Sequence, residues 1–115
     1  MINRKCIAVA ITVACLSVTY PQDVTAQNFT SAQIVDWPQE SRQFYFRTSI
    51  GMAGLIARQN DEVQAECIDG WYFGDEARAQ AHILDVMGTY PTYHPLGVIV
   101  AILEKRCGAL RYVDR

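Results

Sequence analysis

The stretch 95–108, PLGVIVAILEKRCG, carries the clearest fold signal in the 115-residue chain. Proline favours the first turn of a helix and glycine the position just after its end, so the segment predicts one helix between them. Its apolar side chains recur three and four residues apart, on one face: Leu96, Ile99, Val100, Leu103 and Cys107. Lys105 and Arg106 suit the negative pole of such a helix. We therefore expect a helix that presents Cys107 to the core, although the β-branched run at 98–100 alone would favour a strand.

Two helices are predicted at the other end of the folded part. Thr30 and Gln33 form a capping-box pattern that opens a short helix reaching about Trp37. Pro38 then suits the start of a long helix over residues 39–59. One stripe of this long helix is Phe46, Ile50, Ala53 and Ala57, flanked by Tyr45, Ser49, Met52 and Ile56.

Gly51 and Gly54 lie inside the long helix, where each costs up to about 1 kcal/mol relative to alanine. We expect the small residues to let a neighbouring helix approach closely. The alternative is a groove for a ligand at the same place.

Two further helices complete the prediction. Asn60 or Asp61 can cap a third helix that ends at Gly74 and carries Val63, Cys67 and Trp71 on one stripe. Asp75 caps a fourth over residues 76–87, whose apolar stripe is Ala79, Ile83, Val86 and Met87. The fold class predicted is all-α, a small bundle of about five helices.

The first 26 residues predict a cleaved signal peptide. Arg4 and Lys5 precede an uncharged apolar run over residues 6–18, and Val24-Thr25-Ala26 offers small residues for cleavage. A membrane anchor is the alternative, but 13 residues of helix reach only about 20 Å of a core about 30 Å thick. A lipoprotein would use Cys15, after a poor lead-in and a very short apolar run. We expect a periplasmic or secreted protein without membrane contact after cleavage.

Residues 27–115 should form a single helical domain of 89 residues. Removal of Arg4, Lys5 and Asp23 shifts the net charge from −2 to −3. A balanced charge of this kind gives no support for a nucleic-acid partner. Half of the side chains are hydrophobic, which excludes a disordered acidic tail.

Cys67 and Cys107 are the two cysteines that remain after cleavage, and in an oxidising compartment they predict a disulfide. The bond would join the third and fifth helices and close a loop of 40 residues, which restricts the unfolded chain by about 4 kcal/mol. A redox pair would favour Cys-x-x-Cys spacing, and a zinc site four ligands in short paired spacings. The sequence has neither pattern.

No motif fixes an enzymatic activity, a cofactor or a metal site, so we expect a non-enzymatic protein. His82 and Asp85 share a helix face and could form a general base, but a solvated pair is the simpler interpretation because no nucleophile is placed beside them. His94, just before the last helix, is expected to cap it. Asn28-Phe29-Thr30 matches a glycosylation sequon, which matters only in a eukaryotic secretory pathway.

Aromatic side chains are the remaining signal for function. The trios 44–46 and 71–73 each cover most of a helix circumference, so at least one ring of each should be partly exposed. Trp71 is expected to be buried beside the disulfide. Exposed aromatic clusters mark binding surfaces, although half-buried rings can also tile a thin bundle. The candidate partner-binding residues are Trp37, Phe44, Tyr45, Tyr72, Phe73 and Tyr93.

The pattern Cys67-Ile68-Asp69-Gly70-Trp71, a helix, Tyr90-Pro91 to His94-Pro95, and an apolar helix ending at Cys107 resembles the Tai-type amidase-immunity family of type VI secretion. The resemblance covers about residues 67–107. Two features depart from the family: an upstream cysteine of many members is absent, and Leu96 stands where an acidic residue is usual. The resemblance implies a periplasmic helical protein that binds and blocks a toxic cell-wall amidase.

A second, architectural resemblance is to the HdeA-type acid-stress chaperones, which share this size and a single disulfide. It implies a protein that acidification loosens, as carboxylates take up protons, so that it binds unfolded clients. The sequence therefore leaves two hypotheses, an immunity-like protein with one toxin as its partner and a chaperone with many clients. Either could act as a homodimer.

Overall fold

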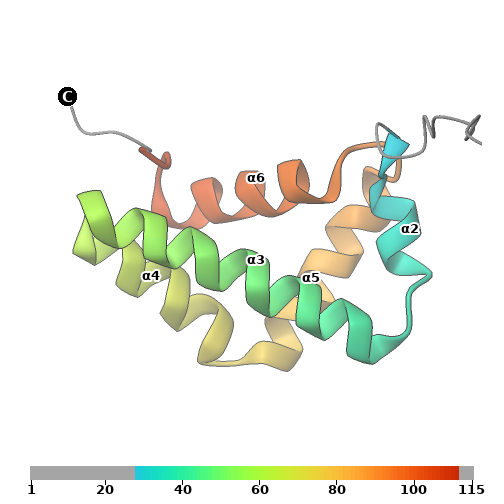
Figure 1. The fold of residues 1–115 in the computed structure, drawn as a ribbon, viewed down its shortest axis with the longest axis horizontal. Coiled ribbons are helices and arrows are strands. Elements are labelled where there is room, and N and C mark those ends of the chain that lie inside the picture. Colours follow the sequence, from blue (N-terminus) through green and yellow to red (C-terminus); the bar gives the residue numbers. More distant parts are fainter. Residues whose placement is uncertain (1–27, 112–115) are drawn as a thin grey trace, which may run out of the picture.

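The computed structural model describes residues 28–111, and this part of the chain is helical throughout, apart from its turns and ends. Its helices are α2 (Ser31–Val35), α3 (Gln39–Asn60), α4 (Glu62–Phe73), α5 (Glu76–Thr89) and α6 (Pro95–Cys107). The long α3 forms a hairpin with α4, while α2 packs on α5 and α6 (Figure 1). The prediction of an all-α bundle with five helices is confirmed. The predicted signal peptide, residues 1–26, lies outside the described residues.

One hydrophobic core joins the five helices. It is built from Ile34 of α2, Phe46 and Ile50 of α3, Ile68 and Tyr72 of α4, Ile83 and Met87 of α5, and Ile99 and Leu103 of α6.

Helix α2 begins as predicted but is capped differently. The Thr30 side chain makes no capping hydrogen bond. Instead, the backbone N–H and the hydroxyl of Ser31 both donate to the Tyr93 carbonyl at 2.8 Å, and the Ala32 N–H donates to the Pro91 carbonyl at 3.0 Å. Carbonyls of the turn before α6 thus satisfy the free N–H groups at the start of α2. The helix ends at Val35, earlier than predicted.

The α3–α4 hairpin needs only Asp61 between its helices, and the Asp61 carboxylate accepts the Gln64 N–H at 3.1 Å as the N-cap of α4. The prediction of a close approach is confirmed for Gly54, which is buried against the Asp69 side chain of α4. Gly51 faces open space. Arg58 bonds Asp69 at 3.1 Å, which adds an ion pair to the same contact.

The predicted apolar stripe of α4 is wrong. Val63 is 76% exposed, Cys67 is exposed and Trp71 is half-buried, whereas the face packed on the core is Gln64, Ala65, Ile68 and Tyr72. The polar Gln64 occupies a core position because its side-chain amide lies 2.9–3.3 Å from the backbone carbonyls of residues 107–109. These bonds satisfy a group that would otherwise be costly to bury. Apolar spacing alone could not reveal them.

Helix α6 has the predicted ends. Pro95 occupies its first turn, the His94 ring nitrogen Nδ1 accepts the Leu96 N–H at 3.1 Å, and Gly108 follows the last residue with a φ of 90°. Its buried face is rotated by about one residue from the prediction. Leu96 is 45% exposed, and the core side is Pro95, Val98, Ile99, Ile102 and Leu103.

Helix α5 begins as predicted, with Asp75 as N-cap and Ala79, Ile83 and Met87 buried, whereas Val86 is half-buried and the helix runs to Thr89 rather than to residue 87. The predicted disulfide is also present: Cys67 of α4 and Cys107 of α6 are bonded, with Cα atoms 5.8 Å apart. Cys107 is half-buried and packs against the core, as expected, whereas Cys67 is exposed. The bond therefore ties α4 to α6 at the surface of the bundle.

Candidate functional site

A groove of about 1010 Å³ lies between α4, α5 and α6. We call it the α6 groove, because half of its twelve lining residues belong to that helix. They are Cys67 and Trp71 of α4, His82 and Val86 of α5, Tyr90 and Tyr93 of the following turn, and Gly97, Val98, Ala101, Ile102, Lys105 and Arg106 of α6. Its size is that of ligand-binding clefts.

The floor of the α6 groove follows from the sequence of α6. Gly97, Ala101 and Lys105 are four residues apart and lie on one helix face, with Val98 and Ile102 beside them. Between Gly97 and Lys105 the helix rises about 12 Å, or two turns. Gly97 and Ala101 are exposed and small, and within residues 28–111 no atom from elsewhere lies within 4 Å of the position that a Gly97 Cβ would take. The floor is therefore smooth and open to an incoming chain.

Aromatic rings form the walls. Trp71 and His82 meet edge to face, with ring centroids 6.2 Å apart, and the Arg106 guanidinium lies 4.9 Å from the Trp71 ring centroid. At the other end the rings of Tyr90 and Tyr93 pack edge to face, with centroids 5.4 Å apart. The two residues are 48% and 61% exposed. Because neighbouring rings hold them in place, these exposed rings can bury apolar area against a partner with little loss of conformational entropy.

Charge in the α6 groove is of one sign. Lys105 and Arg106 lie at the disulfide end, and none of the twelve lining residues is acidic. Two full charges exceed the partial negative charge, about half an elementary charge, at the C-terminal end of α6. The groove therefore combines an apolar floor with a cationic end, in a protein whose net charge is negative.

A smaller hollow of about 650 Å³ lies beside the groove and shares Trp71, His82 and Arg106 with it. Its other lining residues include Asp75 and Arg78, so it is more polar. The stacked Arg106 and Trp71 side chains belong to both spaces.

Of the six candidate partner-binding residues, only Tyr93 lines the α6 groove. Phe44 and Phe73 are 74% and 46% exposed, which agrees with the expectation of an exposed ring in each trio. Trp37 and Tyr45 are half-buried, and both pack against Phe29 with centroids 5.8 and 6.1 Å away.

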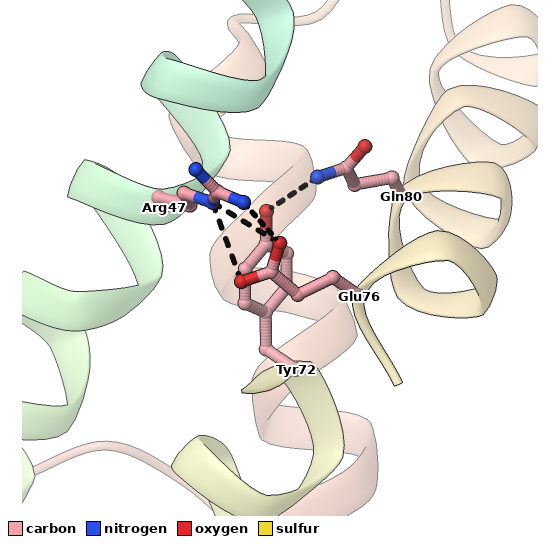
Figure 2. A network of polar contacts seen from close by, with 4 residues as sticks. All are labelled: Arg47, Tyr72, Glu76 and Gln80. Atoms are coloured by element: carbon pink, nitrogen blue, oxygen red, sulfur yellow. Dashed lines mark hydrogen bonds and ion pairs between the residues drawn. The ribbon is translucent and has the colours of Figure 1, made fainter. Parts of the chain in front are cut away.

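Tyr72 is completely buried and therefore cannot contact a partner. The prediction that it belongs to a partner-binding surface is wrong. Its hydroxyl accepts a hydrogen bond from Gln80 at 3.1 Å, beneath the ion pair in which Arg47 holds Glu76 at 2.7 Å (Figure 2). Three residues, Arg47 of α3 and Glu76 and Gln80 of α5, thus lie around the hydroxyl of Tyr72. Trp71, expected to be buried beside the disulfide, is half-buried and lines the groove together with Cys67.

Both histidines pack against aromatic side chains. His82 packs on Trp71, and His94 caps α6 while its ring packs on Phe29 at 5.5 Å. In the described range no three His, Cys, Asp or Glu side chains gather closely enough to hold a metal ion. None of the helices of residues 28–111 has the length and apolar character needed to cross a membrane.

Comparison of the chain with family models, with curated proteins and with solved structures finds no match.

Proposed function

We propose that this protein is an exported, non-enzymatic binding protein that holds an apolar segment of a partner protein in the α6 groove. The observation that carries the proposal is the groove itself, an open apolar floor between exposed rings and two cations. Hot spots of protein interfaces are rich in tyrosine, tryptophan and arginine, and all three line this groove.

An immunity-like role fits this proposal. All twelve groove residues fall within residues 67–107, the span that resembles the Tai-type immunity family. In such a role the partner would be a cell-wall amidase in the periplasm, which the protein would bind and block.

The test is capture of a partner by the mature, oxidised protein, compared with two variants. Ala101→Trp fills the floor of the groove, while Ala81→Trp places the same side chain at an exposed site on α5 outside it. We expect the wild type and Ala81→Trp to retain one partner from periplasmic extract at nanomolar affinity, and Ala101→Trp to lose it. Equal retention by both variants contradicts binding in the groove.

A chaperone role is the second candidate, and it requires that acid loosen the fold. The contacts on which acid could act are the exposed ion pairs of α3, Arg47 with Glu76 of α5 and Arg58 with Asp69 of α4. Rescue of unrelated proteins from aggregation at low pH would support this role. Clients of such a chaperone would bind surfaces that acid exposes. The rescue should therefore be unaffected by Ala101→Trp.

A further inference from the structure

The α6 groove has a defined direction. At one end the paired rings of Tyr90 and Tyr93 bound it, and at the other end Lys105 and Arg106 do. Arg106 is oriented by its contact with Trp71, and Lys105 is exposed. An occupant that matches the groove must be apolar along about two helical turns and anionic at the disulfide end.

The size of the groove indicates the shape of the occupant. Two turns of α-helix, about 12 Å long and about 10 Å across with side chains, fill a cylinder of roughly 950 Å³. A helical segment of this length is therefore of the same order of size as the groove, which has a volume of about 1010 Å³. In addition, Gly97 and Ala101 are small residues four apart, which lets a second helix approach the backbone of α6.

We propose that the α6 groove binds an amphipathic helix of a partner protein, with its apolar face on Gly97 and Ala101 and acidic side chains at Lys105 and Arg106. This inference rests on the proposed function and adds the secondary structure and the charge of the bound element. Burial of the apolar face supplies most of the affinity. The cations select the partner and its direction, because a basic helix would bring like charges together.

The test uses two synthetic helical peptides of about 15 residues, made helical by an internal crosslink because such short helices are marginal in water. Both carry leucines three and four residues apart on one face. They differ in two positions beyond the last leucine, which are glutamate in one peptide and lysine in the other. Dodecanoate serves as a third probe, an anionic amphiphile that is not a helix. Affinity is measured by fluorescence anisotropy, or by displacement for dodecanoate, and location by amide shifts of Gly97 and Ala101.

We expect the glutamate peptide to bind about tenfold more tightly than the lysine peptide at low salt, which corresponds to about 1.4 kcal/mol. The difference should shrink as salt screens the exposed charges. Lys105→Glu, which leaves the Arg106 contact with Trp71 in place, should remove the preference, and the double variant with Arg106→Glu should reverse it. Ala101→Trp should abolish binding of both peptides, whereas Ala81→Trp should not change it.

Binding in the groove and selection of an acidic helix are tested separately by these variants. If Ala101→Trp blocks both peptides but the preference survives Lys105→Glu and the double variant, the charge selection is wrong and the groove remains the binding site. If the peptides leave the Gly97 and Ala101 amides unshifted, or dodecanoate alone shifts them, a helix is the wrong occupant. Binding that is indifferent to Ala101→Trp removes the groove from the proposed function as well. Circular dichroism of each variant confirms that it is folded.

Discussion

At the scale of single residues, the buried polar groups of this protein differ in whether they have a hydrogen-bond partner. Gln64 and the hydroxyl of Tyr72 both have hydrogen-bond partners, the former with backbone carbonyls after α6 and the latter with Gln80. Among the residues that the structure describes, the buried hydroxyl of Tyr45 has no hydrogen-bond partner of good geometry, although the Ser49 side chain is near it. A buried polar group with a partner contributes modestly to stability, whereas one without a partner carries a desolvation penalty.

The two tyrosines should therefore respond differently to loss of the hydroxyl. Tyr72→Phe leaves the half-buried Gln80 amide without its acceptor and should lower the free energy of unfolding by about 1 kcal/mol. Tyr45→Phe removes an unsatisfied group and should leave stability unchanged or raise it. Urea unfolding of both variants measures the difference. A larger loss in Tyr45→Phe than in Tyr72→Phe would contradict the assignment of partners.

Alkaline pH should also destabilise the fold through these residues. Burial raises the pKa of Tyr72 above its ordinary value of about 10, and the neighbouring Glu76 charge raises it further, while the Gln80 hydrogen bond and Arg47 lower it. Burial also raises the pKa of Tyr45, and the nearby Ser49 side chain lowers it by less. The unfolded chain then loses these protons before the folded protein does. This stabilising contribution is complete below pH about 10 and is lost as the pH rises through the folded pKa.

Thermal unfolding between pH about 8 and about 11.5 measures this effect. The melting temperature should fall above pH about 10, and Tyr72→Phe should reduce the steepness of the fall. The exposed Tyr90 provides the control, because Tyr90→Phe should follow the wild-type profile. A Tyr72→Phe profile as steep as that of the control would show that other groups govern the alkaline transition.

At the scale of the helices, the sequence predicts ends better than faces. Asp61, Asp75, His94 and Gly108 end or begin helices as predicted, because caps depend on a few neighbouring residues. Faces depend on what a helix packs against. In α4 the apolar pattern does not predict that Gln64 is buried, because its hydrogen-bond partners are backbone carbonyls 43–45 residues away. The α6 groove escaped sequence reasoning for the same reason, although the spacing of Gly97, Ala101 and Lys105 already marked a smooth face with a cation.

The glycines of α3 provide a test at this scale. Gly51→Ala enters open space and should gain the helix propensity of alanine, up to about 1 kcal/mol. Gly54→Ala places its methyl group against the Asp69 carboxylate, which must turn away and release Arg58. We expect it to lose most or all of that gain, so Gly51→Ala should be the more stable variant by about 1 kcal/mol. Chemical denaturation measures both.

A double-mutant cycle identifies the cause. In an Asp69→Ala background the space beside Gly54 is free, so Gly54→Ala should become as stabilising as Gly51→Ala. If Gly54→Ala remains costly without the Asp69 side chain, then the backbones of α3 and α4, and not this carboxylate, limit the approach.

At the scale of the whole molecule, α6 is the element on which both stability and binding depend. It closes the core through Ile99 and Leu103, and its C-terminal end is fixed by the disulfide to Cys67 and by the Gln64 amide. The same end carries the two cations of the α6 groove. The covalent tie therefore holds Lys105 and Arg106 in place relative to Trp71.

Reduction of the disulfide should weaken both the stability of the fold and binding in the α6 groove. The disulfide closes a loop of 40 residues, so its loss should cost about 4 kcal/mol of stability in the chain-entropy model. Because Cys67 is exposed, a small reductant should open the bond in the folded protein without prior unfolding. Guanidinium unfolding of the oxidised protein, the reduced protein and the Cys67→Ser/Cys107→Ser variant measures the cost. Reduction that proceeds only at denaturant concentrations that unfold the chain would contradict an accessible bond.

The response of the molecule to acid separates the two proposed roles. The ion pairs in the described residues join side chains that are 30–85% exposed. Exposed pairs contribute little to stability, since water and salt screen them. We therefore expect the oxidised protein to keep its helical circular dichroism and its hydrodynamic size from pH 7 down to about 3, and Glu76→Gln to behave like the wild type. A cooperative loss of helix on acidification, accompanied by binding of unfolded proteins, would instead favour the chaperone, because a fold that opens in acid needs carboxylates that matter to its stability.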